Sequence, residues 1–272
     1  MIPTEFAYER PATVEEAVAL LERHGDGARP LAGGHSLVPM MKLRLAAPEA
    51  LIDLSGIPGL AGVRDEGPRI TVGAMTRHAD VAADPMIMAE CPVVAETAAN
   101  IGDRQVRSRG TIGGSLAHSD PHADLPAVLL ALGGSVTVQG PSGRREIAAD
   151  DLFVDLLTTS LADDEILIAV HLPRNRSAAY EKFANRAQDW AMVGAAAAIS
   201  GGRARIALTG MASHAVRAVA AEQAFDGSNA AAAAAKAAEG LSPPSDTAAS
   251  GEFRAHLATV LVERALEAAM AR

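Results

Sequence analysis

Two short segments of this sequence each place a pair of adjacent glycines beside hydroxyl side chains. The first is Ala-Gly-Gly-His-Ser at 32–36, and the second is Thr-Ile-Gly-Gly-Ser at 111–115. Glycines let a backbone turn come close to an anion, so that the amides and hydroxyls that follow can donate hydrogen bonds to it. Neither segment contains the dinucleotide fingerprint or the Walker sequence. Acting together, the two segments could hold a diphosphate between two parts of the molecule, where cofactor sites tend to form.

A run of alternating histidines and aspartates follows the second segment. His118, Asp120, His122 and Asp124 alternate with other residues, and an extended strand would place all of them on one side, where they could bind zinc or manganese. The same run can form a polar loop in which Asp124 caps a helix that begins at Leu125. The spacing leaves both interpretations open. No role is predicted for the other scattered histidines, which are His24, His78, His171, His214 and His256.

The first glycine segment belongs to a predicted β-α-β unit. A helix is expected after Thr13, because Thr13 and Glu16 form a capping box, and Gly25 is expected to end it. Apolar strands are expected at 6–10, 29–32 and 50–54. This order of elements predicts an α/β layer.

The polar segment 173–177 is expected to divide the rest of the chain into a larger part and a small C-terminal α+β unit. The larger part is predicted to contain strands at 60–64, 69–73, 135–139, 144–147 and 166–172, helices at 77–83, 90–101 and 125–132, and a glycine-rich turn at 110–114. The C-terminal unit is predicted to contain a hairpin of strands 193–199 and 204–210 and helices near 215–225, 230–239 and 253–271.

Composition excludes several classes of protein. With 49% hydrophobic and 21% charged residues in 272, the chain is expected to fold as a compact globule. A net charge of −9 argues against nucleic acid as a partner. The single Cys91 cannot form an internal disulfide or supply the thiolates of an iron–sulfur cluster. Without a signal sequence or an apolar run long enough for a transmembrane segment, we expect a cytoplasmic protein.

Taken together, the motifs resemble a known family. The two glycine segments occur in the order found in the FAD-binding medium subunits of molybdenum hydroxylases, a family that includes carbon monoxide dehydrogenase and xanthine dehydrogenase. The resemblance extends through the run Ser-Asp-Pro-His-Ala-Asp-Leu-Pro at 119–126, Tyr-Glu-Lys-Phe at 180–183 and Gln-Asp-Trp-Ala-Met-Val at 188–193.

The resemblance implies an α+β fold with a PCMH-type, vanillyl-alcohol-oxidase-like FAD-binding domain of two α/β sub-domains and a small C-terminal α+β domain. The implied limits are 1–174 for the FAD-binding domain, with sub-domains at about 1–55 and 56–174, and 175–272 for the C-terminal domain. The implied FAD contacts are Pro30, Leu31, Ala32, Gly33, Gly34, His35, Ser36, Leu37, Ile101, Thr111, Ile112, Gly113, Gly114, Ser115, His118, Asp124, Leu161, Lys182 and Trp190.

Some of these residues carry a more specific expectation. The two glycine segments would hold the diphosphate, and Asp124 would bond the nucleotide or ribityl portion. Lys182 could stabilise a reduced anionic flavin. Trp190 is expected either to pack near the flavin ring or to fill the interface between domains.

The resemblance also implies a role and partners. A large molybdenum-cofactor subunit would oxidise the substrate, a small subunit would relay electrons through [2Fe-2S] clusters, and FAD on this chain would pass them to an external acceptor. The expected assembly is a dimer of heterotrimers, a heterohexamer. Ser115 stands where many relatives carry Asn or Asp, so it keeps part of that hydrogen bonding. No nicotinamide-binding signature is present, which favours quinone, cytochrome or oxygen as acceptor.

Two other functions remain open from the residues alone. A metal-dependent hydrolase would use the cluster His118, Asp120, His122 and Asp124. A non-catalytic scaffold subunit would need neither metal nor flavin.

Overall fold

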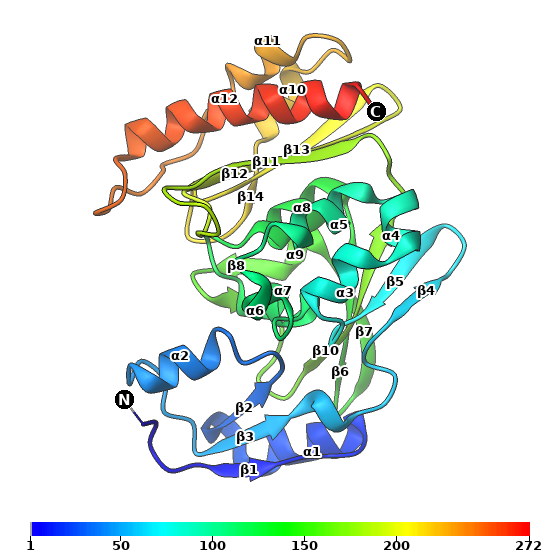
Figure 1. The fold of residues 1–272 in the computed structure, drawn as a ribbon, viewed down its shortest axis with the longest axis vertical. Coiled ribbons are helices and arrows are strands. Elements are labelled where there is room, and N and C mark those ends of the chain that lie inside the picture. The colour runs from blue at the N-terminus through cyan, green and yellow to red at the C-terminus, as the bar shows by residue number, and fades with distance from the viewer. Residues whose placement is uncertain (1) are drawn as a thin grey trace.

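The computed structural model describes residues 2–272. The N-terminal elements, a middle sheet with its helices and a C-terminal sheet with its helices are stacked along the long axis of the molecule (Figure 1). This arrangement gives the mixed α and β architecture that the sequence predicts, in which helices cover the apolar faces of sheets.

The N-terminal part is a parallel three-stranded sheet in the order β1-β3-β2. Its elements are β1 (Ala7–Glu9), α1 (Val14–His24), β2 (Ala28–Leu31), α2 (Leu37–Lys42) and β3 (Ala50–Asp53). The predicted start of α1 is confirmed, because the Thr13 hydroxyl accepts a hydrogen bond from the Glu16 amide at 3.1 Å. The first glycine segment leaves the carboxyl end of β2 and leads into α2.

The middle part is an antiparallel five-stranded sheet in the order β4-β5-β10-β6-β7. Its strands are β4 (Val63–Asp65), β5 (Arg69–Gly73), β6 (Ser135–Gly140), β7 (Gly143–Ala148) and β10 (Ile166–Pro173), and β8 (Phe153–Asp155) and β9 (Thr158–Thr159) form a separate hairpin. Its helices are α3 (His78–Ala83), α4 (Pro85–Glu90), α5 (Pro92–Ala99), α6 (Arg104–Arg107), α7 (Ile112–His118), α8 (Asp124–Leu132) and α9 (Ala149–Leu152).

The two faces of the middle sheet have different environments. Ile70, Val72 and Val136 face the helices and belong to the largest core cluster. On the opposite face, Ile166 and Ile168 pack into the N-terminal core. Alternation along each strand therefore divides the side chains between two cores, as expected for a sheet covered on both sides.

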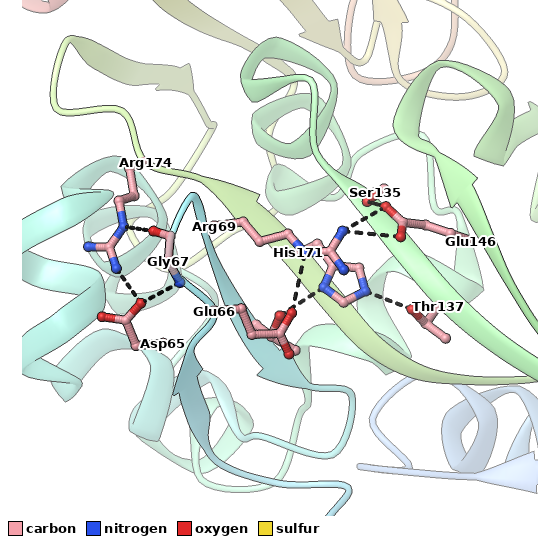
Figure 2. A network of polar contacts seen from close by, with 10 residues as sticks. Asp65, Glu66, Gly67, Arg69, Ser135, Thr137, Glu146, His171 and Arg174 are labelled. Carbon is pink, nitrogen blue, oxygen red and sulfur yellow. Dashed lines mark hydrogen bonds and ion pairs between the residues drawn. The ribbon is translucent and has the colours of Figure 1, made fainter.

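The part of that opposite face beyond the N-terminal core is polar (Figure 2). The Arg69 guanidinium pairs with both Glu66 and Glu146, and the buried His171 ring lies between the hydroxyls of Thr71 and Thr137. These groups satisfy one another, which is typical of the solvent-facing side of an antiparallel sheet.

The C-terminal part is an antiparallel sheet in the order β11-β12-β13-β14 under three helices. Its elements are β11 (Ala178–Phe183), β12 (Val193–Ser200), β13 (Arg203–Thr209), β14 (Val216–Arg217), α10 (Val219–Ala224), α11 (Ala230–Ala234) and α12 (Gly251–Met270). In β12, Ala196 and Ala198 join the core that includes α8, whereas Ala195 and Ala197 join the core under α12. Small side chains on both faces let helices pack on either side of this strand.

Several predicted elements differ in the structure. The helix expected at 90–101 covers only Pro92–Ala99, because Cys91 adopts φ −150° and Pro92, which has no amide hydrogen, starts α5; α4, which ends at Glu90, was not predicted. The region 215–225 begins with β14, and only Ala230–Ala234 is helical in 230–239. Strand β11 and helix α2 were not predicted. Across residues 2–272, none of the helices combines the length and apolar character needed to cross a bilayer.

Candidate cofactor site

The two glycine segments meet at one cavity of about 750 Å³. All but two of the predicted contact residues line it, and the exceptions are Ile112 and Lys182. Ile112 is buried in the core below α7. The hairpin of β8 and β9 and the segment that carries Trp190 complete the wall. A volume of this size is in the range of cavities that enclose cofactors, roughly 300 to 1,000 Å³.

The first glycine segment has unused donors. Gly34 adopts φ +75°, a conformation that glycine takes without steric cost. No acceptor within residues 2–272 takes a hydrogen bond from the backbone amides of Gly33, Gly34, His35 or Ser36. Consecutive amides in such a turn form a concave site with positive potential. This segment can therefore bind an anion without any basic side chain.

Gly33 packs the backbone of the first glycine segment against residues 109–110, which directly precede the second segment. A Cβ atom at this position would lie 2.4 Å from the Arg109 carbonyl oxygen and 2.7 Å from the Gly110 Cα. Gly33 is therefore required by the packing of the protein itself. Its missing side chain lets two backbones pack against each other.

The second segment is not the predicted glycine-rich turn. Gly113 and Gly114 lie in the first turn of α7, which Thr111 caps. The amides of Ile112, Gly113 and Gly114 donate to the Thr76 carbonyl, the Ala74 carbonyl and the Thr111 hydroxyl, at 3.0, 2.9 and 3.1 Å. These amides already donate hydrogen bonds within the protein. The second segment therefore lines the cavity with the hydroxyl groups of Thr111 and Ser115 and with its two glycines.

The histidine–aspartate run does not form the metal site that its spacing allowed. Within residues 2–272, no group of three or more His, Cys, Asp or Glu side chains could hold a metal ion. His118 ends α7 and Ser119 turns the chain with φ 52°, so the run is not an extended strand. The His122 ring is 2.8 Å from the Ala191 carbonyl, and Asp120 accepts from the His122 amide. Burial lowers the pKa of His118.

Asp124 connects α8 to the C-terminal sheet. It is the first residue of α8 and does not cap the helix. Its carboxylate accepts from the Tyr180 hydroxyl at 2.6 Å and from the Lys182 Nζ at 3.0 Å. Burial raises the pKa of Asp124, and the Lys182 charge opposes this effect. Lys182 also donates to the Asn100 carbonyl at 3.2 Å, so it holds Asp124 in place and does not line the cavity itself.

Trp190 lies at the edge of the cavity with 71% of its surface exposed. Of the two expectations for this residue, filling an interface between domains is therefore wrong. The chain is fixed directly after Trp190, since the Ala191 carbonyl lies 2.8 Å from the His122 ring nitrogen and the Met192 amide donates to the Phe183 carbonyl.

Among the cavity residues that the sequence did not predict, His78 is the buried ionisable one. His78 begins α3, is 4% exposed and lines the cavity. The feature that singles out His78 is the burial of an ionisable side chain, and the sequence does not show which side chains are buried.

Comparisons with known proteins agree with this geometry. Residues 4–175 match the family model described as the FAD binding domain in molybdopterin dehydrogenase, and residues 178–269 match the CO dehydrogenase flavoprotein C-terminal domain. The chain is 42% identical to a carbon monoxide dehydrogenase medium chain of Hydrogenophaga pseudoflava, over 100% of this chain and 99% of that one. It is 40% identical to a nicotine 6-hydroxylase medium subunit of Paenarthrobacter nicotinovorans, over 97% of each.

Solved structures give the same result. A carbon monoxide dehydrogenase structure from Hydrogenophaga pseudoflava matches with a TM-score of 0.95 and 43% identity, and quinoline 2-oxidoreductase from Pseudomonas putida 86 matches with 0.93 and 34%. Both matches cover 100% of this chain and 99% of the other. The resemblance, the fold class and the FAD cofactor that the motifs implied are confirmed, and neither alternative function is supported. The chain belongs to the family of FAD-binding subunits of molybdopterin dehydrogenases.

Proposed function

We propose that this chain takes electrons from a partner iron–sulfur subunit and passes them to an external acceptor through FAD bound in the cavity. The observation that carries the proposal is the meeting of both glycine segments at one cavity, with the amides from Gly33 to Ser36 unused. Bound FAD supplies the redox chemistry, and the protein supplies binding and orientation.

The amides from Gly33 to Ser36 would hold the diphosphate. Because amide dipoles carry no net charge, they suit an acidic protein. The hydroxyls of Ser36, Thr111 and Ser115 add donors beside them. The remaining cavity residues proposed to contact FAD are Pro30, Leu31, Ala32, Leu37, Ile101, Gly113, Gly114, His118, Leu161 and Trp190.

Asp124 would accept a hydrogen bond from a hydroxyl of the nucleotide or ribityl portion. Tyr180 and Lys182 fix its two carboxylate oxygens, so it presents a set geometry to the cavity. Lys182 contacts Asp124 without lining the cavity, so Lys182 is a positioning residue for the Asp124 carboxylate. Ile112 supports the start of α7 from below.

We also propose the domain limits 1–174 and 175–272 and an assembly with a large molybdenum subunit and a small [2Fe-2S] subunit as a cytoplasmic heterohexamer. Curated relatives are named as medium chains or medium subunits, which supports partners of other sizes. Cys91 is the only cysteine of the sequence and is buried, so cluster thiolates must come from a partner.

Ligand titration of the flavin-free chain tests the proposed site. Fluorescence quenching should show tight binding of FAD and much weaker binding of riboflavin, because riboflavin lacks the diphosphate that the free amides would bind. Equal affinity for both ligands would contradict the assignment of the diphosphate to Gly33–Ser36.

A further inference from the structure

Within residues 2–272, no group forms a hydrogen bond with either ring nitrogen of His78. The side chain is 4% exposed, its Nδ1 is fully shielded without a partner, and no described residue bonds its Nε2. Nε2 is not among the fully shielded atoms, so it keeps accessible surface, and His78 lines the cavity. Buried polar groups nearly always have a partner, so this exception needs an explanation.

His171 provides the contrast. It is equally buried, at 5% exposed, but its Nδ1 and Nε2 lie 2.9 and 2.6 Å from the hydroxyls of Thr71 and Thr137 (Figure 2). The fold can therefore satisfy a buried histidine completely. At His78 it leaves both nitrogens free.

The His78 ring and the unused amides line the same cavity and are linked through Gly110. A Cβ on Gly110 would be 2.8 Å from the His78 Cδ2 and 3.0 Å from its Nε2, and the Gly110 Cα in turn packs against Gly33. His78, Gly110 and Gly33 are thus consecutive neighbours. Nε2 therefore lies on the Gly110 side of the ring, close to the backbone against which Gly33 packs.

The protonation state follows from burial. Burial, together with the charges of His35 and Arg107, lowers the pKa of His78 to about 4. Near neutral pH the ring carries one N–H and one lone pair. Burying a lone pair without a partner costs less free energy than burying an N–H group without a partner. We therefore assign the hydrogen to Nε2 and the lone pair to the shielded Nδ1.

We propose that the Nε2–H of His78 donates a hydrogen bond to a phosphate oxygen of bound FAD. This inference rests on the proposed function and extends its donor set from the amides at Gly33–Ser36 to a side chain of α3. The unpartnered nitrogen in the flavin-free chain is then the donor that the cofactor uses.

The test compares FAD affinity and thermal stability of flavin-free full-length variants at pH 7.5. His78→Leu removes the donor, His78→Gln keeps an N–H donor at a similar distance, and His171→Leu is the matched control. We expect His78→Leu to weaken FAD binding about tenfold with no fall in melting temperature, since no protein partner is lost. His78→Gln should recover much of the affinity. His171→Leu should lower the melting temperature and leave FAD affinity unchanged.

The competing ligand ADP, which carries the diphosphate without the flavin, locates the contact. Its affinity should fall in His78→Leu by the same factor as that of FAD. Unchanged FAD or ADP affinity in His78→Leu, or a lower melting temperature of its flavin-free form, would overturn the inference. If the wild-type chain bound no FAD, the proposed function itself would fail, which is a distinct result.

Discussion

Gly194 leaves the space that the Tyr180 hydroxyl occupies. A Cβ atom at 194 would lie 2.1 Å from that oxygen, and the oxygen donates to Asp124 at the cavity wall. The missing methyl group at this position of β12 therefore makes room for the contact between Tyr180 and Asp124 of α8.

Gly194→Ala should displace Tyr180 and lower the free energy of unfolding by about 1–3 kcal/mol, the usual cost of overpacking a core. Chemical denaturation measures this change. Tyr180→Phe removes the closest colliding atom, so Gly194→Ala should destabilise the protein less in a Tyr180→Phe background than in the wild type. If the two substitutions were simply additive, the proposed collision would be wrong.

His78 predicts a pH dependence of stability in the flavin-free chain. Its pKa is about 4 in the folded state and near 6.5 in the unfolded state. Above pH 6.5 the ring is neutral in both states. As pH falls from 6.5 to 4, the unfolded state binds the proton first, so folding stability decreases by about 3 kcal/mol in total.

Denaturant unfolding of the flavin-free chain at several pH values between 7.5 and 4 measures this loss. In His78→Leu the loss over that interval should be smaller by the same amount, while contributions from other groups remain. Identical pH profiles for the two chains would contradict the buried, neutral imidazole.

At the scale of elements, helix α12 holds the segment that carries Trp190. Arg254 is 1% exposed and donates to the carbonyls of Met192 and Gly210, at 2.5 and 3.2 Å. Its second terminal nitrogen pairs with Asp246 at 2.6 Å. A C-terminal helix thus fixes backbone that ends close to the cavity edge.

Arg254→Met should release this segment and lower the free energy of unfolding by about 2 kcal/mol, because two buried carbonyls lose a charged donor. Trp190 is the only tryptophan, so intrinsic fluorescence reports on the segment alone. Quenching of this fluorescence by bound FAD should decrease. Arg217→Met, which breaks ion pairs with Glu222 and Asp150 elsewhere in the C-terminal part, should leave the quenching unchanged. Equal quenching in Arg254→Met and wild type would contradict the coupling.

The element scale also shows what the sequence could predict. The capping box at Thr13 and the apolar strands were visible because they depend on local pattern. The helical position of Gly113 was not, since its amide donates to Ala74, which is distant in sequence. Likewise, the contact of Asp124 with Tyr180 and Lys182 depends on tertiary packing, so a local reading gave a metal ligand or a cap instead.

At the scale of the whole molecule, the cavity is built from all three parts of the chain. The first glycine segment comes from the N-terminal part, α7 from the middle part, and Trp190 from the C-terminal part. A ligand that binds across such parts stabilises the folded state as a whole.

FAD should therefore raise the melting temperature of the entire chain in one transition. At a free concentration of 100 times Kd the expected stabilisation is about 2.7 kcal/mol. Differential scanning calorimetry measures it, with riboflavin as the control ligand. Stabilisation of only one of two separate transitions would show that FAD contacts only part of the chain.

The most direct test of the account is a visible absorption spectrum of the tagged chain purified from its native host, before and after acid precipitation, with co-purifying chains counted on a gel. We expect flavin bands that acid releases into the supernatant, a broad iron–sulfur background, and one larger and one smaller partner chain. A colourless chain without partners would contradict it.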